Sequence, residues 1–165
     1  MSRIFRISGN FMQSGKWSKP NPSFSGKIIA DEEGRFYGYC EELYDGASDA
    51  SRIQYIAGAF AENNHRRRQG IAFFKMSNDP SQDPLAYITL DLGNPESGSW
   101  SELSTLGRFL RRGRTRIVVE EEAFSKKAEN SIRAKYDTLD KSINGNDKLL
   151  KEIQSLVSAV VHSAA

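Results

Sequence analysis

Hydrophobic and polar positions alternate along most of residues 1–121, a pattern that predicts short β-strands rather than helices. The segment GIAFFKMSNDPSQDPLAYITLDL (residues 70–92) shows it clearly, because two apolar runs flank a loop rich in Asn, Asp, Ser and Pro. This segment is expected to form a hairpin. One predicted face is wholly apolar, whereas the other mixes aromatic and polar residues. The apolar face includes Ala72, Phe74, Ile88 and Leu90, and the mixed face includes Phe73, Tyr87 and Thr89.

An antiparallel sheet with one solvated face should alternate apolar and polar residues along each strand. The predicted hairpin departs from this rule on both faces. Its apolar face therefore predicts a covering element, with the four apolar residues named above well buried. Its mixed face predicts the interior of a roomy barrel.

Further strands are expected wherever Gly, Pro, Asn and Asp clusters bound a short run of β-forming residues. The turn clusters, which recur about every ten residues, include SKPNPS (18–23), DEEG (31–34) and YDGASDAS (44–51). The strands that they delimit cover residues 4–13, 24–30, 34–43, 52–60, 98–103 and 114–121. No strand–helix–strand alternation is present, so we predict an antiparallel meander. A small up-and-down β-barrel is favoured, with a sandwich as the alternative.

After Phe124 the apolar positions change to a helical spacing. One stripe recurs every three or four residues and comprises Phe124, Ala128, Ile132, Tyr136, Leu139 and Ile143. NGND (144–147) then supplies a helix stop and a new N-cap, and residues 147–162 carry a second apolar face. We therefore predict a β region at 1–121 and a C-terminal helical hairpin at 122–165, in one structural domain. The hairpin packs either on its own sheet or against a second subunit.

The composition is that of an ordinary folded protein, with 38% hydrophobic and 27% charged residues among 165. Lys and Arg number 23 against 21 Asp and Glu, so the formal net charge is only +2, which disfavours nucleic acid as a partner. Cys40 is the single cysteine, which excludes an internal disulfide. No signal-like start and no apolar run of membrane length is present. A cytoplasmic protein without membrane contact is expected.

Three short motifs stand out in the β region. SGKW (14–17) supplies a Gly-x-Trp, DEEGRFYGY (31–39) combines a turn with G-x-F-x-G, and GSW (98–100) places small residues beside a Trp. Together they resemble calycins, the small barrels of lipocalin and avidin type. The Gly-x-Trp trails the first strand instead of lying within it, and a helical hairpin exceeds the usual single helix. The resemblance implies a barrel that holds one small apolar or aromatic ligand.

No binding residue is carried over from the calycins. Five aromatic residues of the predicted strands are nevertheless placed where they would lie near such a cavity. They are Tyr39, Tyr55, Phe73, Tyr87 and Trp100.

Residues suited to catalysis or metal binding are sparse. His65 and His162 have no Cys or His neighbour at ligand spacing, and Cys40 is interpreted as an inert, packed thiol. Phosphate loops, dinucleotide fingerprints and nucleophile elbows are absent from the sequence. Solvated strand edges explain four acidic residues better than a catalytic carboxylate pair does. These are Glu41, Glu42, Glu102 and Glu120. We expect no cofactor and no metal, and an enzyme is disfavoured.

Arginine clusters lie in HRRR (65–68) and in RFLRRGRTR (108–116). Arginine suits phosphate and carboxylate partners. Because EEE follows at 120–122, these arginines are interpreted as solvated hairpin tips paired with nearby acids. Two function classes remain. The first is a small-ligand-binding barrel, and the alternative is an interaction module that uses the arginine-rich loops or the C-terminal helices, the latter also as a homodimer contact.

Overall fold

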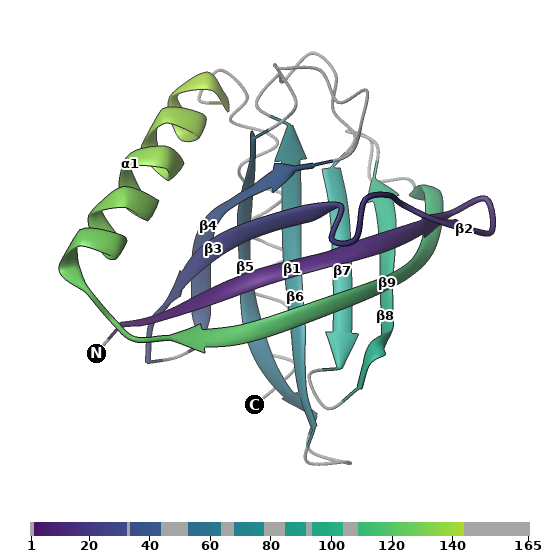
Figure 1. Cartoon of the computed structure of the whole chain (residues 1–165), viewed down its shortest axis with the longest axis horizontal. Coiled ribbons are helices and arrows are strands. Elements are labelled where there is room, and N and C mark those ends of the chain that lie inside the picture. The colour runs from purple at the N-terminus through teal and green to yellow at the C-terminus, as the bar shows by residue number, and fades with distance from the viewer. Residues whose placement is uncertain are drawn as a thin grey trace.

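The computed structural model consists mainly of antiparallel sheet, with a helix toward the C-terminal end (Figure 1). It describes residues 2–32, 34–43, 53–63, 68–77, 85–91, 94–103 and 109–143. Within these ranges, no helix combines the length and hydrophobicity needed to cross a membrane. The predicted class, antiparallel β with C-terminal α, is confirmed.

The strands form a single sheet. They are β1 (Arg3–Gln13), β2 (Lys16–Trp17), β3 (Phe24–Ala30), β4 (Arg35–Glu42), β5 (Ile53–Asn63), β6 (Arg68–Ser77), β7 (Leu85–Asp91), β8 (Asn94–Leu103) and β9 (Phe109–Glu122). They follow chain order across the sheet, except that β2 lies at the edge beyond β1. Every pairing is antiparallel, and from β3 onward each strand pairs with the next. β1 pairs with β3 on one side and with β9 on the other, through eight residue pairs in the second case.

Local sequence explains the tight turns. β1 and β2 are joined by the two residues Ser14 and Gly15, whose φ angles are 52° and 78°. Positive φ at both positions matches the twist of a hairpin, and glycine adopts it without steric cost. The DEEG turn joins β3 to β4 as predicted, with the Asp31 side chain accepting a hydrogen bond from the Arg35 backbone N–H.

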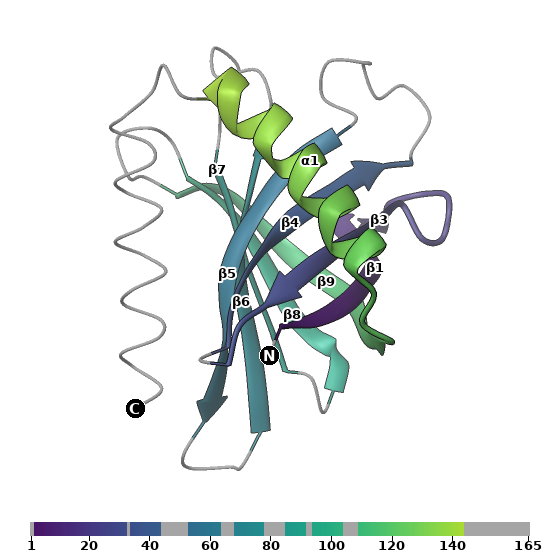
Figure 2. The ribbon, with the colours of Figure 1, turned by 90° about the vertical axis from the view of Figure 1, so that its left-hand side faces the viewer.

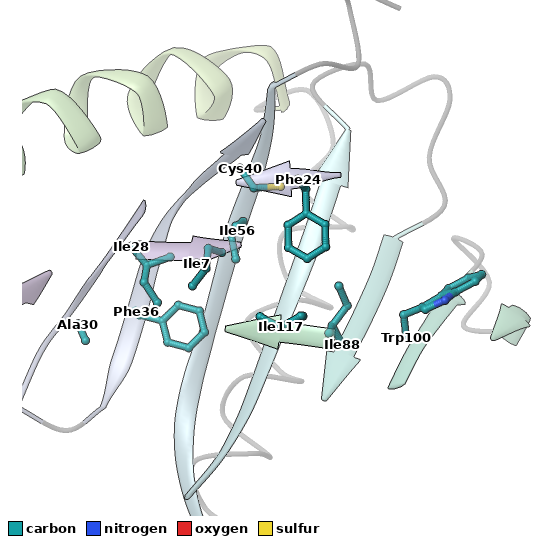
Figure 3. Packing of buried hydrophobic residues seen from close by; sticks show 10 residues of the cluster. All are labelled: Ile7, Phe24, Ile28, Ala30, Phe36, Cys40, Ile56, Ile88, Trp100 and Ile117. Atoms are coloured by element: carbon teal, nitrogen blue, oxygen red, sulfur yellow. The ribbon is translucent and has the colours of Figure 1, made fainter. Parts of the chain in front are cut away.

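The inner face of the sheet holds the main hydrophobic core (Figure 3). Its buried members are Ile7, Phe24, Ile28, Ala30, Phe36, Cys40, Ile56, Ile88, Trp100 and Ile117. Glycines let the strands coil tightly around this core. A Cβ on Gly38 would collide with the backbone carbonyl of Lys27 and lie 2.8 Å from the Cα of Ile28. Close backbone approach of this kind is a common reason for glycine inside a strand.

The outer face is covered in part by α1 (Lys126–Ile143), which lies across β3 and β4 (Figure 2). Ile132 of α1 is buried against Ile4 and Ile29, with Ala128 beside them. The prediction that a C-terminal helix packs on the outer surface of the sheet is therefore confirmed for α1. Phe124 was predicted to open the apolar stripe, but its side chain is 45% exposed because the helix begins two residues later.

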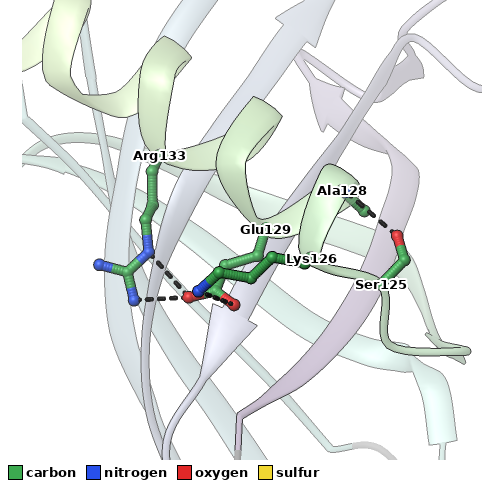
Figure 4. A network of polar contacts seen from close by, with 5 residues as sticks. All are labelled: Ser125, Lys126, Ala128, Glu129 and Arg133. Atoms are coloured by element: carbon green, nitrogen blue, oxygen red, sulfur yellow. Dashed lines mark hydrogen bonds and ion pairs between the residues drawn. The ribbon is translucent and has the colours of Figure 1, made fainter.

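Polar contacts fix the start of α1 (Figure 4). The Ser125 hydroxyl accepts a hydrogen bond from the Ala128 backbone N–H at 3.1 Å, which caps the helix. Glu129 is buried in the first turn and forms ion pairs with Lys126 and Arg133. The second predicted helix, 147–162, lies outside the described residues, so the helical hairpin stays a prediction.

The face assignment predicted for the 70–92 hairpin is wrong. The register places Phe73 opposite Ile88 and Phe74 opposite Tyr87, so the two apolar groups do not share a face. A shift of one residue in a hairpin exchanges the faces of an entire strand, and loop composition alone does not set that register. Ile88 is buried in the core as predicted. The side chains of Ala72, Phe74 and Leu90 lie outside the described part.

Candidate anion-binding face

Two of the five predicted ligand-binding aromatics lie on opposite faces of the sheet. Trp100 belongs to the inner core, where its indole N–H donates to the Met12 carbonyl at 2.9 Å and its ring meets the edge of Phe11. Tyr39 packs on the outer face beneath α1, with the Lys135 Nζ 4.3 Å from its ring centroid. These two residues therefore cannot line one cavity.

The other three predicted aromatics, Tyr55, Phe73 and Tyr87, lie in β5, β6 and β7. Their side chains fall outside the described part, and only their register is known. Tyr55 stands opposite Tyr39, and Phe73 stands opposite Ile88.

Two buried polar side chains of the inner face were not expected from the sequence. Glu42 is 1% exposed and stands opposite Phe24 of the core, so its interpretation as a solvated strand edge is wrong. Thr115 is fully buried, and its hydroxyl has no hydrogen-bond partner among the described residues. The burial of the two residues does not follow from the sequence, because each reaches the inner face only through strand register.

Among the described residues, an arginine stripe on β9 gathers three positive charges that no described carboxylate pairs with. Arg112, Arg114 and Arg116 alternate with the inward positions 113, 115 and 117, so all three lie on the outer face. Arg112 and Arg114 are exposed, and Arg116 is half-buried. Their cross-strand neighbours on β8 are serines, opposite Arg112 and Arg114. The prediction of a hairpin tip is therefore wrong for these arginines, which lie within a strand.

Trp17 stands beside the stripe. The short β1–β2 hairpin pairs Trp17 with Met12, and the Arg116 guanidinium lies 3.7 Å from the centroid of its ring. Arg114 lies farther away, with its guanidinium carbon 5.9 Å from the same centroid. Arginine over an indole is a favourable cation–π arrangement at both separations. Trp17, Arg112, Arg114 and Arg116 are called the arginine face below.

The loop that follows Trp17 is anchored to β1. The Asn10 side-chain amide donates to the carbonyls of Ser18 and Pro20, and the Ser18 hydroxyl accepts a bond from the Phe11 backbone N–H. Asn10 itself is buried and stands opposite Arg116 in the β1–β9 register. This anchoring holds Trp17 in a fixed position against the stripe.

The acidic end of β9 does not neutralise the arginines. Glu121 forms a two-bond ion pair with Arg3, and Glu122 pairs with Lys27. Arg116 is four residues from Glu120, which is about 13 Å along an extended strand and beyond the screening length of about 8 Å at physiological salt. Within the described ranges, no ion pair joins a carboxylate to Arg112, Arg114 or Arg116. The interpretation of these three arginines as acid-paired is therefore wrong.

Hydrogen bonding shifts the pKa values of the ion pair at that acidic end. The bonds from Arg3 hold the pKa of the Glu121 carboxyl below its usual value, and the same bonds raise the pKa of Arg3.

Figure 1 shows β9 beginning beside β2 and ending where the chain turns into α1. The basic and acidic ends of β9 are thus at opposite sides of the molecule.

Other predicted chemistry contributes little here. Cys40 is buried in the core. His65, His162 and most of the HRRR segment lie outside the described residues. Over the ranges that the structure describes, no group of three or more His, Cys, Asp or Glu residues is arranged to hold a metal ion.

No protein-family model, no curated protein and no solved structure matches this chain. The calycin resemblance therefore stays a prediction, and function has to be argued from the geometry alone.

Proposed function

We propose that this chain is a binding module built on a small up-and-down barrel, and that the arginine face holds a multiply anionic partner. One observation carries the proposal: three arginines share one outer strand face, and no described carboxylate pairs with them. The pairing of β1 with both β3 and β9 supports the barrel, which would give the strand a rigid support.

The spacing of the arginines favours a partner that carries several charges. Outward positions of a strand are about 6.7 Å apart, and at that distance two like charges in water repel by about 0.6 kcal/mol. A multivalent anion neutralises the arginines and so removes this repulsion. The cations condensed on the anion are released when it binds. Arginine forks bind phosphate, sulfate and carboxylate groups with two parallel hydrogen bonds.

Arg116 is positioned before any partner arrives. Its Nε–H has no hydrogen-bond acceptor in the described part of the chain, so the contact with Trp17 is what orients the guanidinium. A side chain already held in place loses less conformational entropy on binding, which favours affinity.

Isothermal titration with short inorganic polyphosphate tests this proposal. The variant R112A/R114A/R116A should bind at least about tenfold more weakly than the natural chain, because three charge-assisted contacts are lost. Arg35→Ala is the matched control, since Arg35 is an exposed arginine paired with Asp31 at the β3–β4 turn. Its affinity should not change. Absence of binding by the natural chain, or equal loss in the control, would contradict the proposal.

A second candidate function is retention of a small apolar ligand inside the barrel. The buried Thr115 hydroxyl favours it, because Thr115 stands opposite Phe11 of the inner side and its hydroxyl has no described hydrogen-bond partner. Unpaired buried polar groups are rare and call for an explanation, such as a bound molecule. Native mass spectrometry of freshly purified protein should then show a co-purified small molecule, and a spectrum of unliganded chain only would exclude this candidate.

A further inference from the structure

We infer that the anionic partner of the arginine face is a single-stranded nucleic acid. The inference rests on the proposed function, and it specifies which polyanion the face accepts. Its two supports are the linear spacing of the arginines and the stacked Trp17–Arg116 pair at one end of the row.

The linear spacing favours a chain of charges over a compact anion. Arg112, Arg114 and Arg116 occupy alternate residues of one extended strand, so their Cα atoms span about 13 Å in a nearly straight row. A lone phosphate is too small to occupy the whole row. Consecutive phosphates of a nucleic-acid strand can meet all three, each with its own arginine fork.

The stacked pair favours a partner that has flat rings as well as charge. Arg116 lies over the Trp17 ring at 3.7 Å, and Trp17 is itself only partly buried. Unpaired bases stack on aromatic rings and on the planes of arginine guanidinium groups. Polyphosphate and anionic lipid headgroups offer no such ring, and an acidic peptide offers one only where it carries an aromatic residue. The bases of a duplex are already stacked on one another, so single strands should be preferred.

The surroundings leave room for such a strand and set its length. Serines face Arg112 and Arg114 across the β8–β9 pair, so no bulky side chain stands opposite them. At the other end of β9, Glu120–Glu122 would repel phosphate. The footprint should therefore be short, on the order of three to four nucleotides, near the lower end of known single-strand sites.

The inference reverses the expectation drawn from net charge. A total of +2 reflects an average over the chain, whereas the outer face of β9 carries three positive charges on one half and acidic residues on the other. Binding to a phosphate backbone depends on the local patch.

Fluorescence anisotropy with labelled oligothymidylate and oligouridylate tests the inference, with a duplex of equal length, inorganic polyphosphate and phosphatidylserine vesicles as competitors. Three phosphate contacts on a single strand predict a log–log salt slope of about −2. The single strand should bind about tenfold more tightly than the duplex. Trp17 emission should be quenched on binding, and the quench should vanish in Trp17→Phe, since the buried Trp100 remains in both proteins.

Two variants separate stacking from charge. Trp17→Ala should weaken single-strand binding by about tenfold and polyphosphate binding much less, because polyphosphate loses only the orientation of Arg116 whereas the single strand also loses the stacking contact. Arg116→Lys keeps the charge but not the planar fork, so it should weaken the single strand while the salt slope stays near −2. Circular dichroism of each variant shows whether it has folded, and Arg116→Lys serves as the test if Trp17→Ala does not fold.

The outcomes distinguish the inference from the proposed function. If polyphosphate, duplex or vesicles bind as well as the single strand, and Trp17→Ala has no selective effect, the face binds polyanions in general and this inference fails. If none of the probes binds, both the inference and the proposed function fail. Tight single-strand binding that Arg35→Ala weakens as much as Arg116→Lys would also overturn the inference.

Discussion

The two ends of β9 carry opposite charge, and they differ in whether described residues of opposite charge pair with it. At the acidic end, Glu121 pairs with Arg3 of the neighbouring β1, and Glu122 pairs with Lys27 of β3, one strand farther away. At the basic end, no described carboxylate pairs with Arg112, Arg114 or Arg116. Trp17 holds Arg116 in place. Ion pairs of exposed residues add little to stability. Of the three adjacent arginines only Arg116 has a stabilising contact, so stability explains little of the stripe, in keeping with the binding role proposed above.

Ile117 lies between these two ends, and its replacement should give the largest effect. Its side chain is 1% exposed in the inner core. Ile117→Ala removes buried methyl groups and leaves a cavity, so the free energy of unfolding should fall by about 2–5 kcal/mol. Urea denaturation measures it. A loss below about 1 kcal/mol would mean that β9 is not seated on the core, and the comparison of its ends would lose its structural basis.

Gly113→Ala should have the next largest effect, and it acts beneath the basic end. A Cβ at this position would collide with the Met12 carbonyl and with the indole nitrogen of Trp100, and it would lie 2.8 Å from Trp100 Cε2. The Trp100–Met12 hydrogen bond must then stretch or break. We expect a loss of about 1–3 kcal/mol from this overpacking, measured by thermal and urea unfolding. Unchanged stability would show that β9 moves away from Met12 and Trp100 without strain.

Replacing the arginines should have a smaller effect on stability. Arg116→Ala loses the contact with Trp17 and should cost about 0.5–1 kcal/mol. Arg114→Ala removes an exposed charge beside two others, so the free energy of unfolding should stay within about 0.5 kcal/mol of the natural value. Differential scanning calorimetry of both variants measures the difference in their stability. A large loss in Arg114→Ala would assign a structural role to the stripe and weaken the case for binding.

The smallest effect concerns the titration of Glu121. The folded-state pKa is lowered by the bonds from Arg3, so the pair contributes stability above the unfolded pKa of about 4.3 and loses it as pH falls through the folded value. A carboxyl-detected NMR titration should place the Glu121 midpoint below that of an unpaired glutamate. Arg3→Ala should return it to the ordinary value. A midpoint that Arg3→Ala leaves unmoved would show that the pair does not form in solution.

The fold class was predictable because each strand carries its own alternation and each turn its own residues. DEEG closes a hairpin in the structure as the sequence indicates, whereas the Ser14–Gly15 turn and the short β2 after it were not predicted. Register was not predictable, since one residue of loop length decides whether Phe74 stands opposite Ile88 or Tyr87. Register also decides which residues of a strand face inward, and it places Glu42 and Thr115 on the inner face.

The candidate site was seen only in part. The arginines of residues 108–116 stood out in the sequence, but their nearness to EEE was mistaken for charge pairing. In an extended strand, residues close in sequence can be well separated in space. The role of Trp17 was missed because its contact with Arg116 joins segments about a hundred residues apart, through a β1–β9 pairing that no local pattern encodes.

Nuclear magnetic resonance of ¹⁵N-labelled protein titrated with oligothymidylate tests the central claim most directly, because it observes both ends of β9 at once. The claim predicts shifts in the Trp17 indole signal and in the amides of residues 112–116. The Trp100 indole signal and the amides of residues 120–122 should stay in place. Shifts centred on the acidic end or on Trp100, or no shifts at all, would contradict it.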